Sequence, residues 1–256
     1  QSEVIANNLE SFLSSAVHLE KILGVSQDRR YLLIFQNNSE LRATGGFLGS
    51  YAILDIREGE IRNLEIPGGG SYDTEGAMSV RLVAPKPLWL VNPLWHFWDA
   101  NWWPDWPTSA NHLMWFYEKS GGSTVDGVIS LTPDVIEDLL RITGPINLEE
   151  YGLTINADNF WESVQTVVEY KNLPENYQVD LDLTQSSTSI ESTLPLKQGL
   201  ETNTENKPKK IIGDLTVKLL EILPEKLNKD NLLKIVGLFE KNIAAKNILL
   251  YFSDEE

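Results

Sequence analysis

A polar loop between two predicted strands carries the residue types best suited to hold an anion. It runs from Asn37 to Gly46 and reads NNSELRATGG. The planar guanidinium of Arg42 can bind a phosphate or carboxylate through two parallel hydrogen bonds, while Gly45 and Gly46 would let backbone N–H groups approach the same anion. Asn38 adds a neutral donor. The same residues also suit an ordinary tight turn in which Arg42 pairs with a nearby acid, so their types leave both interpretations open.

An aromatic segment follows, because seven of the eight tryptophans fall between residues 89 and 115. Indole rings stack on sugars and donate to hydroxyl groups. We therefore predict that Asn101 and Trp102 help to bind a ligand. Asp99 and Asp105 could recruit Mg²⁺ if the chain transfers a group. The alternative is a long loop that its large side chains pin to the body of the protein.

Two further places concentrate chemistry-bearing residues. Pro67–Asp73 contains a triple glycine that would suit either a phosphate nest or a flexible hairpin exit, and Asp73 is a candidate catalytic carboxylate. Lys209 and Lys210 belong to the densest local positive charge after Arg29-Arg30. From residue types alone, helix capping or a solvated helix end is the default interpretation of both lysines.

Composition excludes several classes of protein. The formal net charge is −16 and the sequence pI about 4.6, which argues against a nucleic acid partner and against broad adhesion to anionic membranes. The absence of cysteine excludes disulfides and thiolate chemistry. There is no phosphate-binding loop of the Walker type, no serine in a nucleophile elbow and no metal-ligand spacing among the three histidines. No apolar stretch reaches 18 residues, so we expect any membrane anchor of the parent protein to lie outside this chain.

The elements that must position these residues alternate between strands and helices, which predicts a single α/β domain over residues 1–256. We expect a central mixed sheet with helices on both faces. Strands are predicted over 31–35, 47–56, 61–66, 125–131, 146–148 and 247–252. Helices are predicted over an N-terminal stretch within 1–24 and over 108–119, 133–143, 156–171, 207–223 and 229–244. Two insertions complete the chain, a tryptophan-rich one at 71–107 and a flexible polar loop at 184–206.

Several runs resemble the bacterial DUF4012 family. They are Tyr31–Tyr51, Asp99–Ala110, and Val125–Ile129 leading to Ile142–Ile146, and the resemblance covers most of residues 28–252. Members look like exported envelope proteins with membrane anchors and no characterised function. The resemblance therefore implies an extracytoplasmic protein of the cell envelope.

The order of the blocks also resembles, more distantly, the LytR-CpsA-Psr family of extracytoplasmic phosphotransferases. That likeness implies a three-layer α/β sandwich and a catalytic role for Arg42. It also implies a basic cluster at Lys207–Lys210 that meets a polyprenyl-linked diphosphate, which gives Lys209 and Lys210 a role in ligand binding. The chain departs from the pattern at Thr44, where that family has a metal-holding aspartate, and at Gly68, where it has an arginine. Transfer chemistry therefore need not accompany the fold.

These observations predict an envelope protein that binds an anionic glycan or a polyprenyl-phosphate-linked ligand, with glycopolymer phosphotransferase activity as an extension. Arg42 and Asp73 would be catalytic. The alternative is a non-catalytic scaffold or sensor that acts through protein contacts. The surroundings of Arg42 distinguish the two, because exposure in an open apolar-walled groove favours a ligand and burial against Glu40 or Asp55 favours a structural role.

Overall fold

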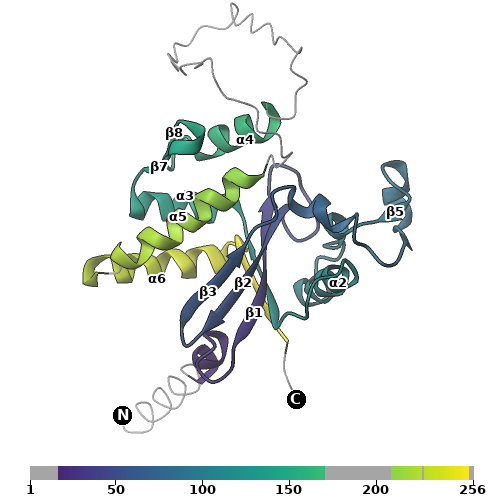
Figure 1. Cartoon of the computed structure of the whole chain (residues 1–256), viewed down its shortest axis with the longest axis horizontal. Coiled ribbons are helices and arrows are strands. Elements are labelled where there is room, and N and C mark those ends of the chain that lie inside the picture. Colours follow the sequence, from purple (N-terminus) through teal and green to yellow (C-terminus); the bar gives the residue numbers. More distant parts are fainter. Residues whose placement is uncertain (1–16, 171–208, 227, 254–256) are drawn as a thin grey trace, which may run out of the picture.

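A five-stranded mixed sheet forms the centre of the molecule in a computed structural model that describes residues 17–170, 209–226 and 228–253 (Figure 1). The strand order is β3-β2-β1-β6-β9. The bounds are Arg29–Asn37 for β1, Phe47–Arg57 for β2, Glu60–Glu65 for β3, Gly127–Leu131 for β6 and Ile248–Phe252 for β9. Only β1 and β6 pair in parallel. The predicted mixed sheet is confirmed.

Strand β1 occupies the middle of the sheet because its apolar run can be buried on both faces. Leu32 and Ile34 are fully buried on one face, and Leu33 is buried on the other. Leu32 lies beside Ile53 of β2 and Val128 of β6. The parallel pairing brings the carboxyl ends of β1 and β6 to the same edge of the sheet.

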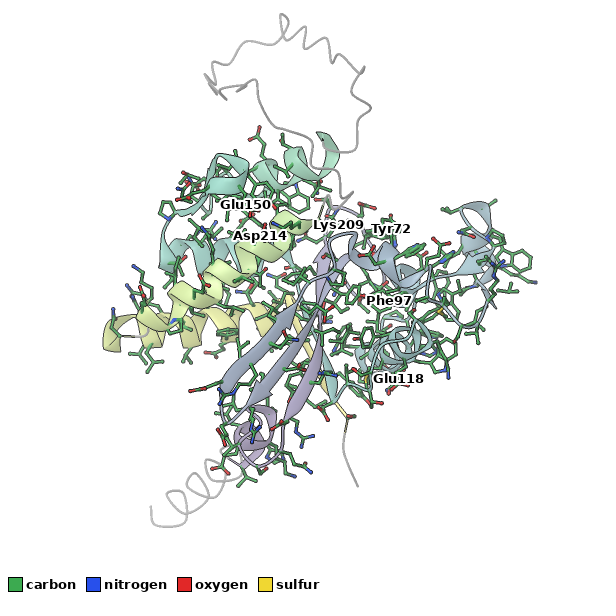
Figure 2. The ribbon with its side chains drawn as sticks, viewed as in Figure 1. Tyr72, Phe97, Glu118, Glu150, Lys209 and Asp214 are labelled. Atoms are coloured by element: carbon green, nitrogen blue, oxygen red, sulfur yellow. The ribbon has the colours of Figure 1, made fainter. Side chains whose placement is uncertain are left out.

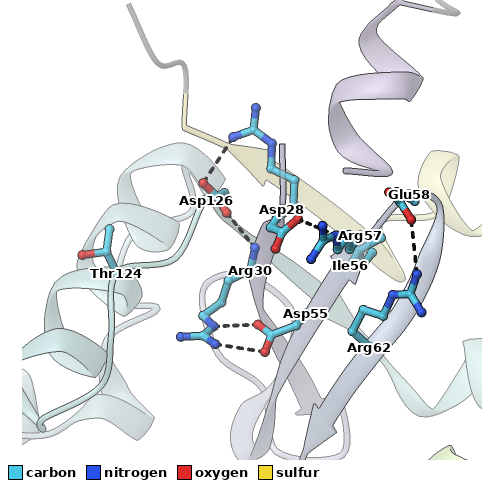
Figure 3. Close-up of a pocket in the computed structure, with 10 residues that line it drawn as sticks. Asp28, Arg30, Asp55, Ile56, Arg57, Glu58, Arg62, Thr124 and Asp126 are labelled. Carbon is cyan, nitrogen blue, oxygen red and sulfur yellow. Dashed lines mark hydrogen bonds and ion pairs between the residues drawn. The ribbon is translucent and has the colours of Figure 1, made fainter. Parts of the chain in front are cut away.

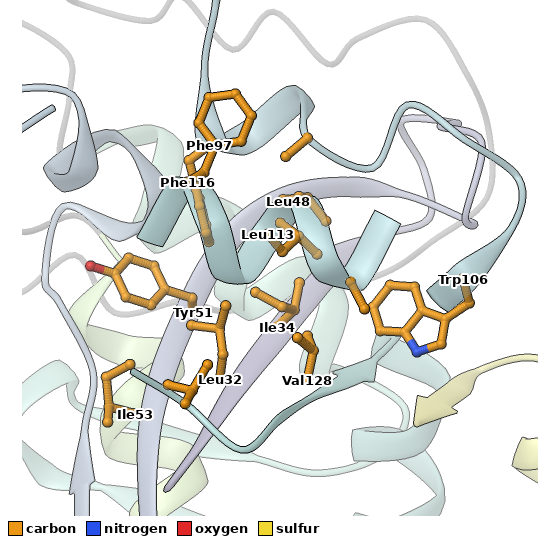
Figure 4. Close-up of a cluster of buried hydrophobic side chains, with 13 residues drawn as sticks. Leu32, Ile34, Leu48, Tyr51, Ile53, Phe97, Trp106, Leu113, Phe116 and Val128 are labelled. Atoms are coloured by element: carbon orange, nitrogen blue, oxygen red, sulfur yellow. The ribbon is translucent and has the colours of Figure 1, made fainter. Parts of the chain in front are cut away.

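One face of the sheet is covered by α2 (Trp106–Lys119) and by the tryptophan-rich segment. Figure 4 shows the buried cluster between them. Its members are Leu32, Ile34, Leu48, Tyr51, Ile53, Phe97, Ala100, Trp106, Ala110, Leu113, Phe116, Val125 and Val128. Large side chains thus pin the long segment to the body of the protein, as the structural interpretation of the tryptophans predicted.

The opposite side of the sheet carries the remaining helices, so the helices lie on both faces as predicted (Figure 1). They are α3 (Pro133–Thr143), α4 (Phe160–Tyr170), α5 (Lys210–Lys226) and α6 (Lys229–Ala244). A hairpin of β7 (Ile146–Leu148) and β8 (Leu153–Ile155) packs with α3, α4 and α5 in a second apolar cluster. None of the described helices is long and apolar enough to span a bilayer.

Some elements differ from the predicted bounds. Helix α2 begins at Trp106 rather than at residue 108, because the Asp105 side chain caps it. The tryptophan-rich segment contains the short turns η1 (Gly70–Thr74), η2 (Lys86–Leu90) and η3 (Phe97–Asp99), and the paired strands β4 (Leu82–Val83) and β5 (Leu94–Trp95). Of the predicted N-terminal helix, residues 17–22 are described and are helical. The loop predicted at 184–206 lies outside the described residues.

Candidate functional site

The polar loop after β1 is held from beneath by two buried amide side chains. The Gln36 Oε1 atom accepts from the Thr44 hydroxyl at 3.0 Å and from the Gly46 N–H at 2.9 Å. The Asn101 Nδ2 atom donates to Thr44 Oγ1 at 2.8 Å and to the Gly46 carbonyl at 2.9 Å. Asn101 is only 1% exposed. It therefore shapes the loop instead of facing a ligand, contrary to the predicted role.

The two glycines of this loop serve backbone packing. A Cβ on Gly46 would lie 2.4 Å from the Asn37 carbonyl oxygen, and Gly45 has a φ of 129° that favours glycine. The Gly45 N–H donates to the Arg42 carbonyl at 3.0 Å, and the Gly46 N–H is taken by Gln36. The N–H groups predicted to bind an anion are thus already hydrogen-bonded within the protein, and the turn interpretation accounts for both glycines.

Arg42 also finds its partners inside the chain. Its Nε lies 3.7 Å from Asp99 Oδ1, and its guanidinium lies 5.0 Å from the centroid of the Phe47 ring. Burial raises the pKa of the Asp99 carboxyl, and the nearby Arg42 charge opposes that rise. The partner is Asp99 rather than Glu40 or Asp55, and the Arg42 side chain is 34% exposed. The ion pair within the chain favours the structural interpretation of Arg42, and its role in ligand binding stays a prediction.

The carboxylates predicted for metal binding or catalysis also have partners within the chain. Asp105 Oδ2 accepts from the backbone N–H and the hydroxyl of Thr108, and these bonds lower the pKa of the Asp105 carboxyl. Asp73 Oδ2 accepts from the Gly69 N–H at 2.9 Å. In the described part of the chain no three His, Asp or Glu residues gather to hold a metal ion. Asp99 and Asp105 thus belong to no such group among the described residues, and their role in Mg²⁺ binding stays a prediction.

Asn38 and Lys210 lie on the surface with acidic partners. Asn38 Nδ2 donates to Asp134 Oδ2 at 2.7 Å. Lys210 Nζ contacts Glu150 at 2.5 Å and Asp214 at 3.1 Å. The solvated helix end is thus the better description of Lys210. Trp102 is partly buried, and neither Trp102 nor Arg42 lines the cavity described next.

A cavity of about 330 Å³ opens at the carboxyl ends of β1 and β6. Ligands of α/β proteins commonly bind at this edge of the sheet. Phe35, Ser50 and Leu131 form its floor, side by side on three adjacent strands. The N-terminal end of α3 and the facing sides of α4 and α5 supply the walls. The apolar wall residues are Pro133, Ile136, Phe160, Trp161, Val164, Val168, Ile212 and Leu215.

Lys209, which the sequence assigned to ligand binding, lies at the polar end of this cavity beside Tyr72 (Figure 2). Its Nζ donates to the Gly49 carbonyl and lies 4.7 Å from the centroid of the Tyr72 ring. Among the described residues no carboxylate reaches ion-pair distance of Nζ. Burial lowers the pKa of Lys209 to about 8, although the charges of Glu40 and Asp73 act in the opposite direction.

The triple glycine makes room for this lysine. A Cβ on Gly70 would lie 2.5 Å from both the Lys209 Cδ atom and the Gly49 carbonyl oxygen, and Gly70 has a φ of 68°. The Lys209 N–H donates to the Gly68 carbonyl at 3.1 Å. The segment therefore seats the lysine stem, a role that neither the phosphate-nest nor the flexible-exit interpretation included.

The Ser50 hydroxyl is a further polar group of this cavity. Ser50 is 1% exposed and lines the cavity, and its buried hydroxyl has no hydrogen-bond partner among the described residues. By contrast the buried Ser130 hydroxyl accepts from Gln36 Nε2 at 2.5 Å. Buried polar groups are nearly always satisfied, so an unpartnered hydroxyl on a cavity wall suggests a ligand atom as its partner.

A larger hollow of about 630 Å³ lies at the opposite end of the sheet (Figure 3). Its lining includes Arg29, Arg30, Arg57 and Arg62, each of which contacts a carboxylate of the chain. Arg30, for example, binds both oxygens of Asp55, at 2.6 and 2.9 Å. The charges in this hollow are thus balanced from within.

The sequence did not reveal Ser50, Gln36 or the aromatic wall of the cavity. Ser50 interrupts an otherwise apolar stretch of β2, which is the one feature that could have identified it. Trp161, the only tryptophan outside the 89–115 segment, lines the cavity, whereas the segment that attracted notice does not.

Comparison with known proteins identifies a family. Among solved structures, the chain is similar to that of the transcriptional regulator yvhJ from Bacillus subtilis, with 9% identity and a TM-score of 0.39 over 88% of this chain and 70% of that one. A likeness that weak carries no argument. No curated protein matches the chain. The family model described as "Protein of unknown function (DUF4012)" matches residues 26–168, more than half of the sequence. The chain therefore belongs to the DUF4012 family.

Proposed function

We propose that this protein binds an amphiphilic anion, such as a polyprenyl-phosphate-linked glycan of the cell envelope, in the cavity at the carboxyl ends of β1 and β6. The observation that carries the proposal is Lys209, an ammonium group at the end of an apolar cavity with no carboxylate partner among the described residues. The extracytoplasmic location belongs to the same proposal and rests on the resemblance of the sequence alone.

Charge favours an anionic head group at this position. An ammonium group removed from water without a counter-charge is costly, and the lowered pKa of Lys209 reflects that cost. An anion within hydrogen-bonding reach would stabilise the protonated form and accept a hydrogen bond from it. The Ser50 hydroxyl on the cavity wall would supply a further hydrogen bond.

The cavity walls favour an apolar tail. Phe160, Trp161, Val164 and Ile212 from α4 and α5 contribute apolar surface that a hydrocarbon chain can cover. A volume of about 330 Å³ lies at the lower end of the range for ligand pockets, roughly 300–1,000 Å³. It suits a phosphate and the first segment of a chain better than a whole lipid. Group transfer is not part of the proposal, because Asp73, Asp99 and Asp105 are bonded within the protein.

Titration calorimetry with farnesyl phosphate tests the proposal. Lys209→Met should weaken binding by about tenfold or more, equivalent to about 1.4 kcal/mol. The matched control is Lys210→Met, which removes the adjacent lysine outside the cavity and should leave the affinity within about twofold. Glu40→Gln should strengthen binding by removing a negative charge from the cavity lining.

Two outcomes would count against this proposal. One is equal loss of affinity in the Lys209 and Lys210 variants, which would indicate general charge attraction. The other is equally tight binding of farnesol, which carries no phosphate and would show that the lysine does not read the head group.

A second candidate, the protein-binding scaffold, is favoured by the outer face of α6. Leu232, Val236, Phe239 and Ile243 are between 39% and 55% exposed and recur at alternating spacings of four and three residues. This spacing forms an apolar stripe of the kind that packs against another helix. If α6 is a protein interface, Val236→Asp should abolish self-association or partner capture in light-scattering measurements and leave farnesyl phosphate binding intact.

A further inference from the structure

The part of the tryptophan-rich segment farthest from the sheet exposes large apolar side chains. We call Val83, Trp89, Leu90 and Val91 the apolar tip. Their exposed fractions are 67%, 50%, 96% and 90%. The tip belongs to the arm formed by β4, η2 and β5, which projects from the body at the right of Figure 1. Leu90 and Val91 are almost fully exposed beside a half-exposed indole, and such a group of apolar side chains is unusual on a surface that has no binding partner.

The backbone of the arm is held firmly, so the exposure of the tip does not come from a loosely attached loop. Val83 pairs with Leu94 across the short β4–β5 ladder. The Ala84 N–H donates to the Pro93 carbonyl at 2.9 Å, and the Ala84 carbonyl accepts from the Trp89 indole N–H at 2.6 Å. The indole N–H is therefore satisfied internally, and only the apolar part of Trp89 is presented outward.

The charge of this region differs from that of the whole chain. The formal net charge is −16 and the chain contains 37 acidic residues, yet residues 76–98 include no Asp or Glu. Arg81 and Lys86 lie in this stretch, and both are exposed. Two exposed basic residues in the same stretch as exposed aliphatic and indole side chains match an anionic lipid surface, where aliphatic groups enter the acyl region and basic groups meet the head groups.

We propose that the apolar tip inserts into the interface of an anionic lipid bilayer and docks the protein on the membrane surface. The overall negative charge argues against broad adhesion, but a projecting tip keeps most of that charge away from the lipid, and salt screens it over about 8 Å. The convex shape favours a bilayer over a protein partner. A few projecting side chains bury far less than the roughly 1,000 Å² of a stable protein interface, whereas a bilayer needs no complementary pocket.

The arm is also linked to the cavity by a series of side-chain contacts. Asn92, at the base of the tip, bonds His96 at 2.9 Å, and the His96 ring stacks on Trp98 at 4.2 Å. The ring centroids of Trp98 and Tyr72 are in turn 4.7 Å apart, and Tyr72 lies beside Lys209. Membrane docking would thus hold the cavity rim at a fixed position relative to the lipid. Docking itself does not depend on the proposed ligand, and the two can be tested separately.

Single-cysteine labelling provides a direct test, because the chain has no cysteine of its own. Leu90→Cys carrying an environment-sensitive fluorophore should shift its emission to the blue with vesicles rich in phosphatidylglycerol. Leu233→Cys on α6 is the matched control, since Leu233 is 78% exposed and lies on a different element. Its label should not respond. Leu90→Asp combined with Val91→Asp should weaken co-sedimentation of the full chain with these vesicles by about tenfold or more.

Further variants distinguish membrane docking from its alternatives. Lys86→Glu should weaken binding to anionic vesicles more than to phosphatidylcholine vesicles. Lys209→Met should leave vesicle binding unchanged, which separates this inference from the proposed ligand. The inference is overturned if the protein does not bind the vesicles, if Leu233→Asp weakens binding as much as the tip variants do, or if the tip variants instead abolish self-association measured without lipid.

Discussion

The two hollows at opposite ends of the sheet differ in whether their charged side chains have partners of opposite charge. At the amino end of β1, four arginines line a wide hollow and each contacts a carboxylate of the chain (Figure 3). At the carboxyl end, a smaller apolar cavity holds Lys209, whose Nζ has only a carbonyl and aromatic rings for partners among the described residues. The comparison teaches that the density of charge does not identify a binding site. A charge left without a counter-charge is more informative.

The largest effect on stability is expected at the balanced end. Asp126 contacts Arg29 at 3.2 Å and accepts from the Arg30 backbone N–H at 2.6 Å. Asp126→Ala removes both interactions at a partly buried position, so we expect a loss of about 2–3 kcal/mol, or roughly 5–10 °C in melting temperature. Thermal unfolding checks this. Asp28→Ala is the control, because the Asp28 side chain pairs with Arg57 but is 72% exposed. It should lower the free energy of unfolding by less than about 1 kcal/mol.

At the carboxyl end of the sheet, removal of the Lys209 charge should stabilise the protein, the opposite of the effect expected at Asp126. Below pH 8 Lys209 is protonated in both the folded and unfolded states, and the folded state bears the cost of burying the charge. Lys209→Met should therefore stabilise the protein at neutral pH, by an amount on the order of 1–2 kcal/mol.

The pH dependence of Lys209 sharpens this test. Between about pH 8 and the ordinary lysine pKa of 10.5, Lys209 is more protonated in the unfolded state than in the folded state, so its own contribution to wild-type stability should rise with pH. The advantage of Lys209→Met should shrink over the same range, which urea titrations at several pH values would reveal. Destabilisation at pH 7 would mean that the bond from Nζ to the Gly49 carbonyl outweighs the burial of the charge.

Two buried serines extend the comparison to neutral groups. Ser130→Ala removes the hydroxyl that accepts a hydrogen bond from Gln36, and should lower the free energy of unfolding by about 1 kcal/mol. Ser50→Ala removes a hydroxyl that has no partner in the described part of the chain, and should leave stability unchanged or raise it by up to about 1 kcal/mol. Farnesyl phosphate affinity should fall in the Ser50 variant. Equal destabilisation by the two substitutions would argue against an unpartnered hydroxyl in the cavity.

The smallest effect is expected for Arg42, the residue that the sequence placed at the centre of the site. Its contact with Asp99 is 3.7 Å long and partly exposed, so Arg42→Met should change stability by less than about 1 kcal/mol. Ligand affinity should stay within about twofold. A tenfold loss of affinity without loss of stability would restore Arg42 to the binding site.

The sheet was predictable from sequence because its evidence is local. The apolar run from Tyr31 to Phe35 indicates a strand buried on both faces, and Thr132-Pro133 before an apolar period of helical spacing marks the start of α3. The start of α2 was placed too late, although Asp105 followed by Pro107 is a recognisable capping pattern.

The cavity could not be predicted because its parts are distant in the chain. Phe35, Ser50 and Leu131 meet only through strand register, and α4 and α5 bring Trp161 and Ile212 to them. The role of Arg42 depended on a tertiary contact with Asp99, which no spacing rule indicates. Lys209 was named because of a family resemblance, and its local sequence suggested only a solvated helix end.

The titration of Lys209 in the presence and absence of farnesyl phosphate tests the central claim most directly. In protein labelled with ¹³C at lysine Cε, with Lys209→Arg to assign the signal, the free protein should show a pKa near 8. Bound phosphate should raise that pKa by at least about one unit, because the anion stabilises the protonated ammonium. A Lys209 pKa that stays the same when the ligand saturates the protein would contradict the account.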